Sequence, residues 1–113
     1  MGSKIIALSK NEDFKKLLKK RKLSNRYATI YFGYLDNKNN KRLNISFVTK
    51  KNLGNAVKRN KIKRRLRNIM NDLTNEISLN LNFSFLVIAK STMLNSEFKN
   101  IKETLLRDFK KIK

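Results

Sequence analysis

Residues 50–67 read KKNLGNAVKRNKIKRRLR and hold nine basic residues but no acidic one. Apolar residues recur through this stretch and beyond it at helical spacing, which distinguishes it from a disordered basic tail. When each residue is advanced by about 100° from Arg59, the apolar residues fall within an arc of about 100°. The pattern therefore predicts a long helix, from about Asn55 to Leu79, that packs on a domain through one stripe. That stripe comprises Ile62, Leu66, Ile69, Met70, Leu73 and Ile77.

The two flanks of the predicted helix are cationic. Arg59 lies almost on the line of the apolar stripe, where its long stem can cross apolar surface while the guanidinium reaches a groove. Asn55 is a favoured N-cap residue, and Gly54 permits a close approach of the backbone. The free N–H groups at this helix end favour a phosphate. One contiguous surface holds Arg59, Asn60, Lys63, Arg64 and Arg67, and the other flank holds Lys61 and Arg65.

Length and charge indicate one basic domain. The chain has 113 residues, of which 40% are hydrophobic, and its formal net charge is +20. The basic excess is uneven, because residues 14–71 contain 19 basic residues and one acid, whereas residues 72–113 contain seven basic and five acidic residues. Such a charge favours a polyanionic partner that contacts the first two thirds of the chain. Nucleic acid is the leading candidate, and an anionic membrane surface and an acidic protein remain alternatives.

The sequence contains no Cys and no His, which excludes disulfides, Cys/His zinc sites and Cys- or His-based catalysis. No apolar run approaches the roughly 20 residues that cross a bilayer. We expect a cytoplasmic protein that does not span a membrane. Glu12 and Asp13 form the only adjacent acidic pair, in a first helical turn where acids favour the helix dipole. The other acids form no metal-ligand pattern, so we expect neither a catalytic residue nor a metal site on this chain.

The chain before the basic helix predicts one helix and a hairpin. Ser9 and Glu12 are spaced as a capping box, and a short helix is expected behind them, ending near Lys22, with Phe14, Leu17 and Leu18 on one face. Residues 27–35 are rich in aromatic and β-branched residues and predict a strand. Residues 36–40 predict a turn, and residues 43–49 predict the second arm of a hairpin. A stable sheet requires further strands.

After the basic helix, a strand and a helix are expected. Residues 83–89, FSFLVIA, are nearly all apolar, as in a strand buried on both faces. Asn95 or Ser96 is expected to cap a last helix, and its amphipathic stripe would be Phe98, Ile101, Leu105 and Phe109. The whole pattern predicts a single α+β domain over residues 1–113.

The basic helix resembles the signature helix of the bacterial ribonuclease P protein subunit. The matching residues are Gly54 to Val57, then Arg59-Asn60-Lys61-Ile62-Lys63-Arg64, and Arg67. The resemblance extends over nearly the whole chain, including Lys10 to Phe14, Asn25-Arg26 and Lys50-Lys51. The motif order, and not charge alone, favours this family over a ribosomal or general RNA-binding protein and over a DNA-binding protein, which remain rival hypotheses.

The resemblance implies a compact α-β-β-β-α-β-α domain with a four-stranded sheet and a left-handed β-α-β crossover, where general rules favour the right-handed one. It implies a protein that assists a catalytic RNA. That RNA, with magnesium that it mainly binds itself, would hydrolyse one phosphodiester of precursor tRNA and release the 5′ leader. The partners would be this RNA and the leader, and the free protein is expected to be monomeric.

The resemblance also implies two sets of site residues. Lys61 stands where the family usually has Arg, so charge is kept but the planar fork is lost. Leu18 stands where relatives often have a second aromatic, so the leader should depend more on stacking on the other aromatics. The set for the RNA subunit is Lys50, Lys51, Asn55, Arg59, Asn60, Lys61, Lys63, Arg64 and Arg67. The set for the leader cleft is Phe14, Leu18 and Tyr31, and for Phe14 and Tyr31 core packing is the competing interpretation.

Overall fold

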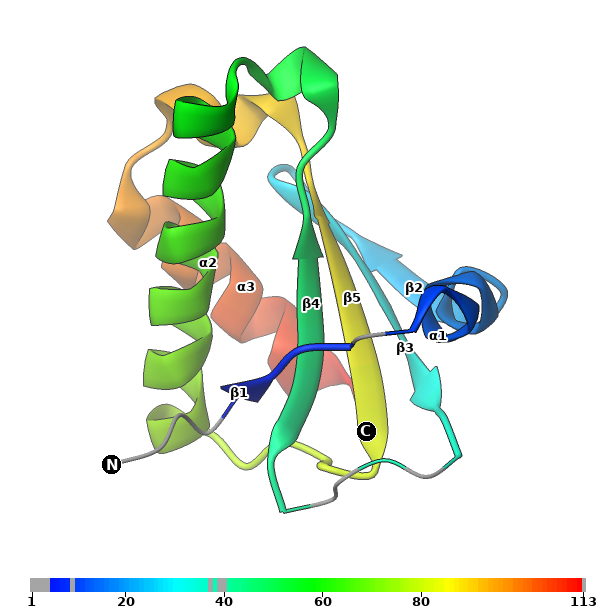
Figure 1. Ribbon diagram of the computed structural model, residues 1–113. Coiled ribbons are helices and arrows are strands. Elements are labelled where there is room, and N and C mark those ends of the chain that lie inside the picture. The colour runs from blue at the N-terminus through cyan, green and yellow to red at the C-terminus, as the bar shows by residue number, and fades with distance from the viewer. Residues whose placement is uncertain (1–4, 9, 37, 39–40, 113) are drawn as a thin grey trace.

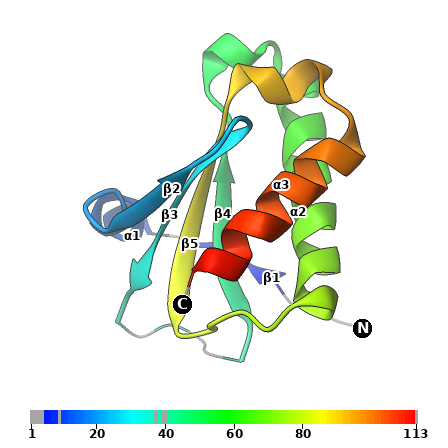
Figure 2. The same ribbon diagram turned by 180° about the vertical axis from the view of Figure 1, so that it is seen from behind.

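A mixed five-stranded sheet separates one short helix from two longer ones (Figures 1 and 2). The structure is a computed structural model that describes residues 5–8, 10–36, 38 and 41–112. The elements in chain order are β1 (Ile5–Ile6), α1 (Asn11–Leu17), β2 (Arg21–Ser24), β3 (Ala28–Tyr34), β4 (Leu43–Val48), η1 (Lys51–Leu53), α2 (Ala56–Glu76), β5 (Phe83–Ala89), η2 (Ser91–Asn95) and α3 (Phe98–Lys111), where η1 and η2 are 3-10 helices.

The strands lie in the order β1-β4-β5-β3-β2. β5 pairs parallel with β4 and antiparallel with β3, so the predicted hairpin between β3 and β4 is wrong. The physical reason is the composition of β5, whose side chains are nearly all buried on both faces of the sheet. A strand of this kind is most stable in the centre of a sheet, where both of its edges are paired. The prediction that residues 83–89 form such a strand is confirmed.

The region around α1 differs most from the prediction. α1 ends at Leu17 rather than near Lys22, and β2 occupies part of the expected helix and pairs antiparallel with β3. Residues such as Leu, Lys and Arg favour a helix locally, but pairing with β3 overrides this preference. The N-cap residue of α1 is Lys10, without a side-chain capping bond, and the predicted capping Ser9 lies outside the described residues. From α1 onwards the expected α-β-β-β-α-β-α order is confirmed, and the two-residue β1 makes the sheet five-stranded rather than four-stranded.

The β4-α2-β5 unit connects two adjacent parallel strands. In Figure 2, β4 runs upward, β5 lies to its left, and α3 lies on the near face of the sheet, the face on which α2 also packs. A connection that crosses the near face and moves left is left-handed, as the family resemblance implied and against the general preference. This crossover places the N-terminus of α2 at the end of the molecule where β4 finishes (Figure 1).

Two apolar clusters lie on opposite faces of the sheet. The larger one joins the sheet to α2 and α3, and the smaller one joins it to α1. α2 begins at Ala56 and ends at Glu76, three residues before the predicted end, so Ile77 follows the helix and is only partly buried. The predicted stripe on α2 is otherwise confirmed, with Ile62, Leu66, Ile69, Met70 and Leu73 all buried.

The N-cap residue of the last helix, α3, is Glu97 rather than Asn95 or Ser96, and its side chain makes no capping bond, because η2 occupies the segment in front of the helix. Its stripe is buried at Ile101, Leu105 and Phe109, whereas Phe98 in the first turn is exposed. None of the helices in the described ranges is long and apolar enough to span a membrane.

Candidate nucleic-acid interface

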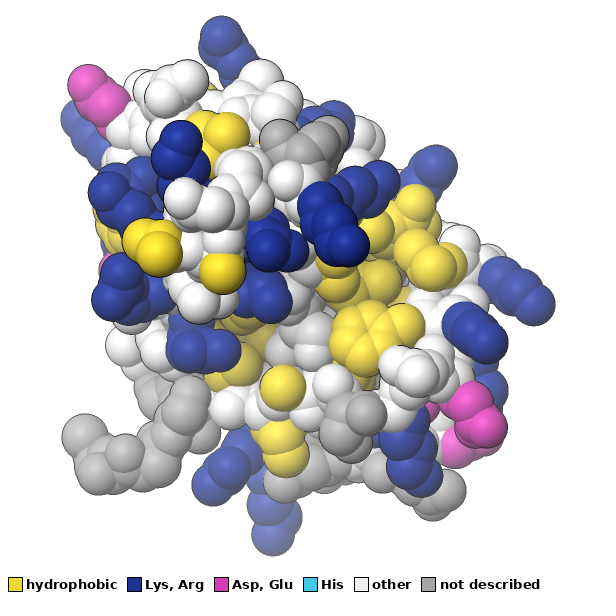
Figure 3. Space-filling view, turned by 45° about the horizontal axis from the view of Figure 1, so that its top comes forward, with side chains coloured by type: hydrophobic (Ala, Val, Ile, Leu, Met, Phe, Trp, Pro, Cys, Tyr) yellow, Lys and Arg dark blue, Asp and Glu magenta, His cyan; other side chains and the backbone are white. Residues whose placement is uncertain are grey.

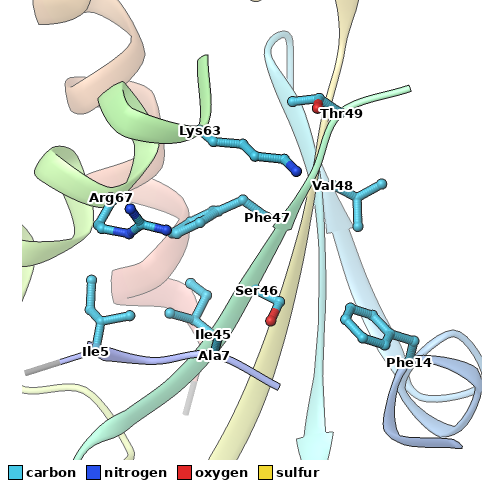
Figure 4. A pocket seen from close by; sticks show the side chains of 10 residues that line it. All are labelled: Ile5, Ala7, Phe14, Ile45, Ser46, Phe47, Val48, Thr49, Lys63 and Arg67. Carbon is cyan, nitrogen blue, oxygen red and sulfur yellow. The ribbon is translucent and has the colours of Figure 1, made fainter. Parts of the chain in front are cut away.

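A cleft of about 570 Å³ lies between α1, β4, α2 and the N-terminal segment (Figure 4). Phe14 and Val48 lie on one side of β4, whereas Lys63, Arg67 and Phe47 lie on the other. The cleft therefore has an aromatic end and a cationic end, with strand β4 passing between them. A single nucleic-acid strand needs this combination of stacking surface and phosphate-binding cations.

β4 contributes an open edge to this cleft. β1 pairs only with Leu43 and Asn44, and no other described strand runs along the outer edge of β4 beyond them. The N-terminal segment crosses β4 near its middle (Figure 1), where the Leu8 backbone N–H donates a hydrogen bond of 2.8 Å to Ser46 Oγ. This bond fixes the base of the cleft next to Ile5 and Ala7, which also line it.

α1 forms the aromatic wall. Phe14 is half-buried and lines the cleft. Leu17, about one helical turn further along α1, is fully buried against the sheet. A largely buried ion pair between Asp13 and Lys38 ties α1 to the segment after β3. The wall is therefore held by a small apolar contact and one ion pair.

The other two residues predicted for the leader cleft do not line it. Tyr31 is half-buried, packs against the small cluster around Leu17, and has Lys22 Nζ 5.9 Å from its ring centroid. Leu18 is the C-cap residue of α1 and is 48% exposed. Phe14 is thus the predicted aromatic that the structure brings into the cleft.

α2 forms the cationic wall. Lys63 and Arg67 line the cleft, and Asn60 and Arg64 are exposed on the same flank of the helix. Arg59 is half-buried, and its Nε is buried without a hydrogen-bond partner in the part of the chain that the structure describes. A buried donor of this kind is unfavourable in the free protein, so an acceptor from a ligand would stabilise it.

The N-terminus of α2 is a second feature of this wall. Asn55 caps the helix as predicted, since its Oδ1 accepts a hydrogen bond of 3.0 Å from the Lys58 backbone N–H. Gly54 has a φ of 117°, which a residue with a side chain rarely adopts. Lys50 and Lys51 are exposed just before it. Cations therefore accompany the positive end of the helix dipole.

Lys61 lies on the opposite flank of α2, as the angular pattern predicted. Together with Lys58 and Arg65 it borders a hollow of about 290 Å³ against η2. The structure therefore divides the predicted RNA-binding residues that belong to α2 between its two flanks. Figure 3 shows Lys and Arg side chains gathered over this face of the molecule, with an apolar patch beside them.

The ribonuclease P family model matches residues 3–113. This chain belongs to the ribonuclease P protein family. It is 34% identical over 104 residues to the ribonuclease P protein component of Listeria welshimeri, covering 91% of this chain and 84% of the relative. The component from Bacillus pumilus is 35% identical over 105 residues, covering 92% and 85% of the two chains.

Solved ribonuclease P proteins share the fold. The protein from Thermotoga maritima superposes with a TM-score of 0.79 at 25% identity, covering 96% of this chain and 98% of the other. The protein from Staphylococcus aureus gives a TM-score of 0.76 at 28% identity, covering 94% and 93%. Family membership makes this chain a component of a ribonucleoprotein that functions in tRNA 5′ processing and thereby in an endoribonuclease activity.

The sequence alone did not predict several residues that line the cleft of this ribonuclease P protein. Ile5 and Ala7 carry no local signal, because they line the cleft only where the N-terminal segment crosses β4. Phe47 and Val48 lie in the segment predicted as a strand, but the sequence pattern did not assign them to the cleft that they line. Among the described residues, no group of three or more Asp, Glu, His or Cys side chains could hold a metal ion.

Proposed function

We propose that this ribonuclease P protein holds the 5′ leader of precursor tRNA in the cleft and binds the catalytic RNA through the remaining cations of α2. The observation that carries the proposal is the joint lining of one cleft by Phe14 and by Lys63 and Arg67. The N-terminal half of α2 carries further cations outside the cleft, which leaves a second basic surface for a second RNA partner.

The leader would lie as a single strand along the open edge of β4. Phe14 would stack a base, and Lys63 and Arg67 would contact phosphates, as sequence-tolerant single-strand binders do. Tyr31 would support this wall from the adjacent cluster, and Leu18 would contribute at its exposed margin. Because stacking and phosphate contacts read no base edges, such a cleft would accept leaders of varied sequence.

The catalytic RNA would contact the N-terminal half of α2. The unpartnered Nε of Arg59 would gain an acceptor, and Asn60 and Arg64 would contact the RNA on the same flank. Lys61 would act from the opposite flank, as a point charge rather than a fork. Lys50 and Lys51 would contact phosphates beside the α2 N-terminus, where Asn55 maintains the free N–H groups by capping the helix.

In this proposal the chemistry would lie on the RNA and not on the protein. The RNA subunit would hold most of the magnesium, which supplies Lewis-acid and water-activating chemistry for phosphodiester hydrolysis when bound. The protein would bind the leader, orient it and neutralise nearby phosphates. We expect the free protein to be monomeric and the assembled particle to act in the cytoplasm.

Reconstitution tests the proposal directly. The protein is mixed with a bacterial ribonuclease P RNA at low magnesium and near-physiological salt, and cleavage of precursor tRNA is measured with long and very short leaders. We expect the protein to increase cleavage, with a larger gain for the long leader. No gain over the RNA alone would reject the role, and a gain independent of leader length would reject the leader cleft.

The contact surface on α2 can be tested through salt dependence. Arg64→Ala should weaken binding of the catalytic RNA, and Arg67→Ala should weaken binding of the leader. Each should flatten the slope of log affinity against log salt by roughly 0.7–0.9 per lost phosphate contact. Arg107→Ala is the matched control, because Arg107 is exposed on α3. An unchanged slope in the α2 variants would place these arginines away from the RNA.

A further inference from the structure

A second hollow with basic and aromatic residues lies near the opposite edge of the sheet from the cleft. It has a volume of about 440 Å³ and is bordered by Lys19, Lys20, Arg21, Phe32, Tyr34 and Phe83, with Gly33 between the two aromatics of β3. The cleft uses β4 near one edge of the sheet, whereas this hollow uses β2 at the opposite edge and its neighbour β3. The leader cleft and this hollow share no lining residue.

Tyr34 is the aromatic residue of this hollow that is both packed on a neighbour and largely exposed. Its side chain lies on the same face as Phe32, which belongs to the cluster under α2 and α3, whereas Phe14 and Tyr31 belong to the α1 face. Its ring packs on Phe83, with centroids 4.6 Å apart and planes inclined by 59°, yet the residue is 60% exposed. Phe83 beneath it is buried, so Tyr34 is held in place while much of its surface remains available.

Cations surround this aromatic surface without acidic partners. The Arg21 guanidinium lies 5.1 Å from the centroid of the Phe32 ring, and Lys19 and Lys20 are exposed beside it. None of the ion pairs found in the described part of the chain involves these three residues. The Lys20 stem lies against Gly33, where an added Cβ would come within 2.9 Å of Lys20 Cδ.

We propose that this hollow binds unpaired RNA, with a base against Tyr34 and the adjoining phosphates at Lys19 and Arg21. A fixed, exposed aromatic face next to unpaired cations is the combination that holds single strands without reading their sequence. An acidic peptide would satisfy the cations but would leave the Tyr34 face unused. The structure therefore favours a nucleotide over an acidic protein segment.

The test must separate this hollow from the cleft, so it uses a Phe14→Ala/Arg67→Ala background. Binding of a fluorescent uridine hexamer to this background is compared with binding to the same protein carrying Tyr34→Leu, which still covers Phe83. We expect Tyr34→Leu to lower affinity by about five- to 150-fold, as for the loss of one stacked base. Tyr34→Phe should retain the affinity, and Phe98→Leu, which alters an exposed aromatic on α3, should leave it unchanged.

A hexamer that contains 5-iodouridine adds a positional readout, because irradiation should crosslink it to the peptide that contains Tyr34. Equal affinity of the Tyr34→Leu and background proteins, or no crosslink at that peptide, would overturn the proposal. Equally tight binding of hexaglutamate would overturn it in favour of an acidic protein partner. If the cleft does not hold the leader, the background protein will bind the hexamer like the original protein, and the Tyr34 comparison will still decide. A thermal melt of each variant establishes that it is folded.

Discussion

The two walls of the cleft are built in different ways. α2 has 21 residues and five buried apolar side chains that belong to the large cluster. α1 has seven residues, and its one buried apolar side chain, Leu17, belongs to a cluster of three buried residues. The cationic wall is therefore part of the main core, whereas the aromatic wall is held by a small contact and by the Asp13–Lys38 ion pair. The two walls should respond differently to substitution.

The largest effect is expected in the cationic wall. Leu66 is fully buried in the middle of α2, so Leu66→Ala should lower the free energy of unfolding by about 2–5 kcal/mol, because it removes apolar contacts and leaves a cavity. Urea denaturation at constant ionic strength measures this. Leu18→Ala is the matched control in the other wall and should change stability by less than about 0.5 kcal/mol, because Leu18 is largely exposed. Equal losses for the two variants would contradict the difference between the walls.

The aromatic wall should affect binding more than stability. Phe14→Ala should cost about 1–3 kcal/mol in leader affinity if the ring stacks a base. Titration of the reconstituted particle with a fluorescent leader measures this, and Phe98→Ala provides a control with another exposed aromatic. If Phe14→Ala melts earlier but keeps its leader affinity, the ring serves packing and not binding.

Loss of the Asp13–Lys38 ion pair should destabilise α1 more than α2. Lys38→Met leaves the largely buried Asp13 carboxylate without this partner, which should cost about 1–2 kcal/mol and accelerate hydrogen exchange of the α1 amides more than that of α2. Adding Asp13→Asn to the same chain should recover part of the loss. Lys10→Met is the control, since Lys10 is exposed beside α1. Uniform acceleration of exchange in both helices would show that the ion pair does not act on α1 alone.

The smallest effect is expected where α2 meets α3 at the surface. The hydrogen bond to Glu76, supported by the charges of Glu76 and Asp72, raises the pKa of Lys102 above its usual 10.5. A raised pKa in the folded state means that the ion pair stabilises the fold below pH 10.5 and that this contribution disappears as the pH rises through the higher value. The melting temperature of Lys102→Gln should therefore lie slightly below that of the original protein at pH 7, and the two should converge above pH 10.5. Lys99→Gln is the exposed control on α3. A difference that grows at high pH would contradict this assignment.

The contrast between the walls also explains which predictions succeeded. The start of α2 and its cap followed from the residue types at Gly54 and Asn55. The buried stripe followed from spacing, because a helix of this length repeats its pattern several times. Strand β5 was equally recognisable from its continuous apolar run. The short segment after Phe14 offered no such repetition, and its helix-forming residues concealed strand β2.

By itself, the sequence determined the basic helix, its apolar stripe and the division of its cations between two flanks, because these depend only on 3.6 residues per turn. Tertiary structure decided what those cations face. The left-handed crossover and the placement of β5 between β3 and β4 bring Phe14 within one cleft of Lys63 and Arg67. Tertiary structure also decided that Tyr34 remains exposed over Phe83, since strand pairing and burial depend on residues far apart in the chain.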